Sequence, residues 1–165
     1  MSEIRRRPRG VLPARAEKPA AGSCVVMPPG DTIALTVFGR PAPQGSKTPM
    51  GFEANHRTRP WREAIRALCV DKLPPDWEKL DGPLSIEMWF YFDRLKGHRS
   101  GDLPCTKSTY DVDKLSRAMN DGLTEGGVIV DDARVVDMYS HKRYCEIGTE
   151  TRALVIVSPY FSPLP

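Results

Sequence analysis

Proline is the residue that most limits what this chain can fold into. The 165-residue sequence contains 16 prolines against 13 glycines. A proline inside a helix or a central strand removes a backbone hydrogen bond, so prolines collect in loops and at the ends of elements. Breakers such as Pro28-Pro29-Gly30 and Pro74-Pro75 therefore mark where regular elements stop.

Between these breakers the sequence predicts strands that intermix with helices. β-Branched and aromatic residues, or short apolar runs, indicate the strands, and apolar residues at helical spacing indicate the helices. The predicted strands cover 32–38, 84–92, 128–130, 134–146 and 151–158, with the last two paired as a hairpin across Gly148-Thr149. The predicted helices run from Pro60 to the residue before Pro74 and over 111–123. This order indicates a single small α/β (α+β) domain with a mixed β-sheet and packed helices.

Composition excludes several classes of protein. No apolar run approaches the roughly 18–20 residues that a membrane span needs, and no apolar segment follows the basic N-terminus as a signal peptide requires. The four cysteines lie far apart with no C-x-x-C pair, so neither a zinc site nor a disulfide framework is indicated. We therefore expect a protein of the reducing cytoplasm.

Positive charge is concentrated at the N-terminus. Residues 1–22 hold six basic and two acidic side chains, whereas the rest of the chain holds 18 basic and 19 acidic ones. We interpret residues 1–30 as a flexible basic arm and 31–160 as the folded domain. Because that domain is not uniformly basic, any binding of a polyanion must come from local clusters of cations.

Acidic residues around the second predicted helix form the most informative pattern. Asp113, Arg117 and Asp121 are four residues apart and form one stripe on the helix, while Val112, Leu115, Met119 and Leu123 form its core-facing side. Asp111 leads into the helix, and Asp131-Asp132 follow the predicted strand at 128–130. We expect that strand to bring the second carboxylate pair beside the first.

Gathered carboxylates point to a divalent cation. They repel one another unless a hard cation such as Mg²⁺ relieves the repulsion, and two such ions commonly promote hydrolysis of phosphodiesters. Nearby cations could hold the phosphate: Lys114, Arg117, Lys142 and Arg143. A structural interpretation stays open, because an Asp before a helix is often a cap, such a stripe is often a surface ion-pair ladder, and Asp-Asp after a strand is often a turn.

These motifs resemble the RusA family of Holliday junction resolvases, endodeoxyribonucleases frequently carried by phages and prophages. The resemblance covers most of residues 32–158. Its specific part runs from Asp111-Val-Asp113 through Asp121-Gly-Leu-Thr and Gly-Val-Ile-Val to Asp131-Asp132-Ala-Arg-Val. The resemblance extends to Pro60–Ala64 and His141–Tyr144, and to the proline loop Gly39–Lys47, which is a weaker match when taken alone.

The resemblance implies a small homodimer that resolves four-way DNA junctions with Mg²⁺, or with Mn²⁺, by paired symmetric nicks. Such an enzyme acts in DNA recombination and repair, in the cytoplasm of a bacterial or phage-infected cell. Asp111, Asp113 and Asp132 match the family's metal-binding acids, and Asp131 matches the neighbouring acid of the pair.

Two positions depart from the family pattern. Its basic helix residue is usually Lys and is Arg117 here, and its Asn after the second acid is Lys114. Arg effectively cannot release a proton, so we expect Arg117 to complete the catalytic set through its charge on the phosphate. The residues expected to contact the DNA backbone are Lys47, Arg62, Lys114, Lys142 and Arg143.

Two other functions remain as alternatives. A junction-binding protein with impaired catalysis would fit the Lys114 and Arg117 departures. A nucleotide-sugar glycosyltransferase could use Asp111-Val-Asp113 as its metal motif, but it would leave Asp131-Asp132 without a role.

Overall fold

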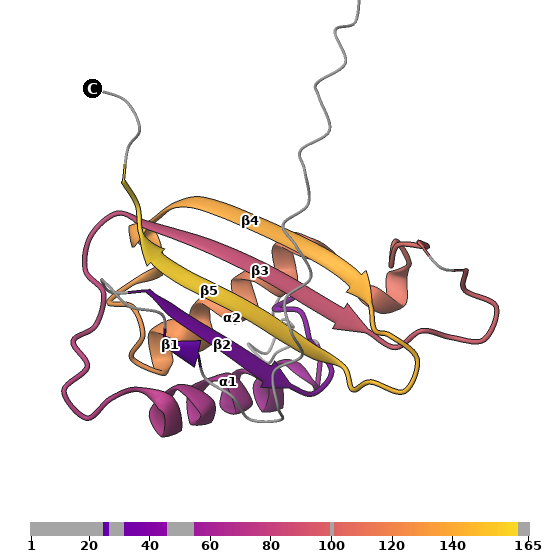
Figure 1. The fold of residues 1–165 in the computed structure, drawn as a ribbon, viewed down its shortest axis with the longest axis horizontal. Coiled ribbons are helices and arrows are strands. Elements are labelled where there is room, and N and C mark those ends of the chain that lie inside the picture. The colour runs from indigo at the N-terminus through magenta and orange to yellow at the C-terminus, as the bar shows by residue number, and fades with distance from the viewer. Residues whose placement is uncertain (1–24, 27–31, 46–54, 100, 162–165) are drawn as a thin grey trace, which may run out of the picture.

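One mixed β-sheet with two helices packed behind it forms the domain (Figure 1). The computed structural model describes residues 25–26, 32–45, 55–99 and 101–161, so most of the predicted basic arm lies outside the described residues. The strands are β1 (Val25–Val26), β2 (Ile33–Phe38), β3 (Leu84–Phe92), β4 (Val135–Tyr144) and β5 (Arg152–Pro159). The helices are α1 (Thr58–Lys72) and α2 (Val112–Glu125), with short 3₁₀ turns η1 (Lys107–Thr109) and η2 (Asp132–Arg134).

The sheet order is β1-β2-β5-β3-β4. β3 pairs antiparallel with β5 and parallel with β4. A parallel pair needs a long crossover between its strands, and the segment that contains α2 provides it. The predicted α+β class with a mixed sheet is therefore confirmed, as are the strands predicted at 32–38 and 84–92 and both helices.

Two predictions about the later strands are wrong. β4 and β5 do not form a hairpin, because β3 lies between them and pairs with both. β3 buries every second side chain and is an interior strand of the sheet, with β5 on one side and β4 on the other, so these two strands pair with β3 and not with one another. The segment predicted as a strand at 128–130 makes only an isolated parallel bridge, from Ile129 to Leu80.

The core lies between the sheet and the helices. The buried side chains of β3 alternate along the strand: Leu84, Ile86, Met88, Phe90 and Phe92. α2 contributes Leu115, Met119 and Leu123, as predicted, whereas Val112 is 38% exposed rather than core-facing. None of the helices that the structure describes is long and apolar enough to cross a membrane.

α2 and β4 run in opposite directions and contact one another along their length. The Ser116 and Ser140 hydroxyls lie 2.8 Å apart, and Asn120 Nδ2 lies 3.9 Å from Met138 Sδ. At the other end of the contact, Lys142 Nζ donates to the carbonyl oxygen of Tyr110 at 2.6 Å. The beginning of α2 is therefore placed beside the end of β4.

Candidate active site

Asp111 occupies the position before the first residue of α2 but does not cap the helix. Its side chain accepts no capping hydrogen bond and instead accepts one from Lys114 Nζ at 2.7 Å. Asp113 lies in the first turn of the helix, and both acids are exposed. Helix capping, the structural interpretation of Asp111, therefore does not explain this residue.

The electrostatics around Asp111 favour its ionised form. The hydrogen bond and positive charge of Lys114, with a smaller contribution from Lys142, hold the pKa of Asp111 below its ordinary value. The same pair raises the pKa of Lys114. The helix therefore begins with a carboxylate that stays charged in mild acid, beside two lysines.

The backbone leading into Asp111 is strained. Tyr110 has φ 60°, the left-handed region that non-glycine residues rarely adopt, at a typical cost of about 1–3 kcal/mol. Lys142 holds this bend from β4, because its Nζ contacts Tyr110 O at 2.6 Å and Thr109 Oγ1 at 3.4 Å. Lys142 was predicted from the sequence to contact DNA, and the structure places it at the same end of α2 as Asp111.

The second carboxylate pair lies elsewhere, and the expectation that it returns beside the first within one chain is wrong. Asp131 and Asp132 come immediately before β4, whereas Asp111 lies near its end; β4 runs from left to right across Figure 1. The 14 residues of α2 carry the chain about 20 Å away before β4 begins. Among the described residues, no group of three or more His, Cys, Asp or Glu side chains is placed to hold a metal ion.

Asp131 does have a structural role of its own. It is the N-cap of η2, where its Oδ1 accepts a hydrogen bond from the backbone N–H of Ala133 at 2.8 Å. Asp132 is exposed on η2. The turn interpretation therefore accounts for Asp131, but not for Asp132.

The remaining predicted cations have different surroundings. Arg62 reaches from α1 to two acids of α2, with Nη1 at 3.7 Å from Asp121 Oδ2 and Nη2 hydrogen-bonded to Glu125 Oε1. Its guanidinium thus joins the two helices, and we leave it out of the proposed DNA contacts. Arg117 and Arg143 are exposed, and Lys47 lies outside the described residues.

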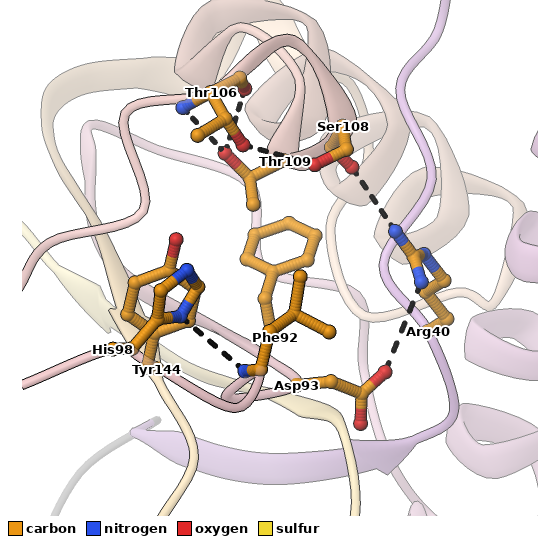
Figure 2. Close-up of a pocket in the computed structure, with 9 residues that line it drawn as sticks. Arg40, Phe92, Asp93, His98, Thr106, Ser108, Thr109 and Tyr144 are labelled. Carbon is orange, nitrogen blue, oxygen red and sulfur yellow. Dashed lines mark hydrogen bonds and ion pairs between the residues drawn. The ribbon is translucent and has the colours of Figure 1, made fainter.

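A small pocket that the sequence did not reveal opens beside this end of α2 (Figure 2). Its volume is about 110 Å³. The lining comes from three separate parts of the chain: Arg40, Phe92, Asp93, Leu95, His98, Thr106, Ser108, Thr109 and Tyr144. Thr109 connects the pocket with the Lys142–Tyr110 contact described above.

Comparison with known families assigns the chain. The model of the family described as endodeoxyribonuclease RusA matches residues 37–155, which include the pocket, both carboxylate pairs, β3, β4, the end of β2 and the first half of β5. This chain belongs to the RusA family. No curated protein sequence matches it significantly. The RusA-family assignment confirms the resemblance drawn from the sequence and makes the protein an endodeoxyribonuclease by family.

Proposed function

We propose that this RusA-family protein is a Mg²⁺-dependent endonuclease that resolves four-way DNA junctions by paired symmetric nicks, in recombination and repair. Its setting would be the cytoplasm of a bacterial or phage-infected cell. The observation that supports this best is Asp111, a helix N-cap residue whose carboxylate does not cap the helix and faces Lys114 instead. With Asp113 it offers exposed carboxylate oxygens at the strained end of α2.

The acids at this end suit Mg²⁺ in kind. Mg²⁺ prefers oxygen ligands and is often held by one or two carboxylates together with water and substrate phosphates, and Mn²⁺ accepts similar ligands. Asp111 and Asp113 would hold it here. When bound, the ion lowers the pKa of an attacking water and stabilises the leaving oxygen.

The cations at this end would position the phosphate. Lys114 and Lys142 would attract it, and Lys114 would leave Asp111 to contact the DNA when the substrate binds. Arg117, four residues after Asp113, would stabilise the extra negative charge of the reacting phosphate. Since Arg keeps its proton, this role is electrostatic. Arg143, exposed one residue beyond Lys142, is the proposed contact with the flanking DNA backbone.

A homodimer would give the second carboxylate pair a role. One chain holds Asp111 and Asp132 at opposite ends of the α2–β4 layer, so a single chain does not bring them together. In a two-fold dimer, Asp132 of the partner subunit is available to complete the acid set, and Asp131 would act by fixing the turn. Two equivalent sites would also match the two opposing strands that a resolvase must cut.

The first experiment replaces the acids one at a time. Asp111→Asn, Asp113→Asn and Asp132→Asn should each abolish cleavage of a four-way junction while leaving gel-shift binding and the circular dichroism spectrum unchanged. Asp76→Asn, at an exposed acid in the turn after α1, is the matched control and should cleave normally. Full cleavage by any of the three variants would remove that residue from the proposed site.

Mixing two inactive proteins tests the shared site. In mixed dimers of Asp113→Asn and Asp132→Asn, a site shared across the dimer places both substitutions in one site and leaves the other site intact. Cleavage should therefore return on mixing, as single nicks. If each site is built from one chain alone, both sites of the mixed dimer are damaged and the mixture stays inactive.

One observation favours the alternative of a junction-binding protein with impaired catalysis. Lys114, which stands where the family usually has Asn, neutralises Asp111 across 2.7 Å. If wild-type protein binds junctions without cutting them in Mg²⁺ or Mn²⁺, this alternative holds. Lys114→Asn should then restore cleavage, because it frees the Asp111 carboxylate.

A further inference from the structure

We infer that the pocket beside the start of α2 holds one unpaired nucleobase of the DNA strand being cut (Figure 2). This inference rests on the proposed function and adds to it a subsite that selects and orients the substrate strand. The residues that would contact the base are Arg40, Asp93, His98 and Tyr144.

The pocket lies close to Asp111 along the chain. The pocket wall includes Thr109, two residues before Asp111. Two residues span at most about 7 Å, or roughly two steps of 3.4 Å along one DNA strand. A strand whose phosphate lies at Asp111 can therefore place a neighbouring base in the pocket.

The shape of the pocket suits a flat ring. The ring centroids of His98 and Tyr144 lie 4.4 Å apart, with the rings tilted by 35°, and Phe92, which is 2% exposed, also lines the pocket. Aromatic side chains are the usual surfaces on which proteins stack unpaired bases. The volume of about 110 Å³ is near the roughly 150 Å³ of a cavity known to hold one benzene ring. It therefore suits part of one flat base but excludes a base pair.

Charge distinguishes a base from a phosphate as the occupant. Arg40 is held at the rim by Ser108 O at 3.1 Å and by Asp93 Oδ2 at 3.8 Å, so the rim pairs a cation with an exposed carboxylate. The carboxylate of Asp93 would repel a phosphate. Arg40 has five N–H donors and Asp93 two acceptor oxygens, a mixture that matches the donors and acceptors on the edge of a base.

The aromatic wall is fixed before DNA binds. Leu95 and His98 close a turn in which His98 N donates to Leu95 O at 3.2 Å and Leu95 N donates to His98 Nδ1 at 3.3 Å. Gly97 has φ 99°, a conformation that other residues rarely adopt. Because the ring is held by its own turn, little freedom is lost when a base stacks on it.

Branched DNA supplies such a base at low cost. Extruding a base is least costly where it is already unpaired, and the branch point of a junction is where pairing is weakest. Capture of one base there would set the register of the strand over Asp111. The pocket would thus decide which phosphate near the branch point is cut.

Abasic substitution tests this inference. In a junction with a mapped cut site, each nucleotide flanking the cut phosphate is replaced in turn by an abasic site, and single-turnover cleavage is measured. One position should lose roughly ten-fold in rate, and His98→Ala should lose a similar factor on the intact junction but nothing more on that abasic junction. Tyr160→Ala, which removes an exposed aromatic ring at the other end of β3, should behave as wild type.

The outcomes separate this inference from the proposed function. Equal cleavage of every abasic junction, or a further loss by His98→Ala on the abasic one, would overturn the base pocket while leaving the nuclease intact. If the wild type cuts nothing, the proposed function fails, and 2-aminopurine placed at each position then tests the pocket by binding alone. Its fluorescence should change at one position with wild type and less so with His98→Ala; no change at any position would overturn the inference.

Discussion

Gly122→Ala tests how closely the two helices pack. Gly122 is buried in α2, and a Cβ atom added there would lie 2.8 Å from both Cβ and Cγ2 of Ile65 and 3.0 Å from its Cδ1. Ile65 is fully buried in α1, so it has no open space into which it can turn. The substitution must therefore push the helices apart or distort the core.

The expected loss of stability is modest and can be estimated. Overpacking of a core typically costs about 1–3 kcal/mol, and the better helix propensity of Ala returns about 0.8–1.0 kcal/mol. We expect a net loss of about 1 kcal/mol, measured by urea unfolding followed by circular dichroism. Gly82→Ala is the control, because nothing lies within 4 Å of its added Cβ; it should be neutral or slightly stabilising.

A double-mutant cycle makes the test specific. Ile65→Ala removes the Cγ2 and Cδ1 atoms that Gly122→Ala would meet, so the added methyl group should destabilise that background less than it does the wild type. An equal loss in both backgrounds would refute the reasoning. So would a Gly122→Ala protein as stable as Gly82→Ala.

Three further predictions concern the two ends of α2. Lys114→Ala should raise the pKa of Asp111 toward its ordinary value in an NMR titration of the carboxyl groups, because Lys114 is the main cause of the lowered pKa. The Asp111–Lys114 pair stabilises the folded protein above the pKa that Asp111 has in the unfolded chain, and this stabilisation is lost as the pH falls through the lower pKa of Asp111 in the folded protein. An unchanged pKa of Asp111 in Lys114→Ala would contradict the contact. Asp131→Ala should lower the free energy of unfolding by about 1 kcal/mol through loss of its cap, whereas Asp132→Ala should change it little, and equal losses would remove the distinction drawn between them. Arg143→Ala should reduce the slope of log binding constant against log salt by about 0.9, while Glu146→Ala should leave it unchanged; an unaltered slope in Arg143→Ala would take that residue out of the DNA contacts.

Local patterns in the sequence predicted the individual elements well. The strand at 84–92 is recovered residue for residue, because its apolar and aromatic run begins directly after Gly82-Pro83 and ends at the charged pair Asp93-Arg94. The helix predicted at 111–123 is also present, from Val112 to Glu125, with Leu115, Met119 and Leu123 buried as their spacing required. These features depend on residues that are close together in the sequence, so the spacing of apolar residues is enough to predict them.

The spacing of apolar residues does not predict which distant segments pair in the sheet. The strands at 134–146 and 151–158 look like a hairpin because they are adjacent in the sequence, yet β3 lies between them. Asp132 was expected beside Asp111 because a strand at 128–130 would bring the chain back, but that strand is absent and the length of α2 separates the two acids. The pocket draws Arg40, His98 and Tyr144 from three separate segments, and no periodicity links such residues.

The most direct test of the proposed function is the cleavage of a four-way junction. An end-labelled mobile junction is incubated with the protein, with and without Mg²⁺, beside a linear duplex of the same sequence, and the products are separated on a denaturing gel. We expect nicks at symmetric positions in two opposing strands, only with Mg²⁺ and only in the junction, and none with Asp113→Asn. Equal cutting of the linear duplex, or cutting that survives in Asp113→Asn, would contradict it.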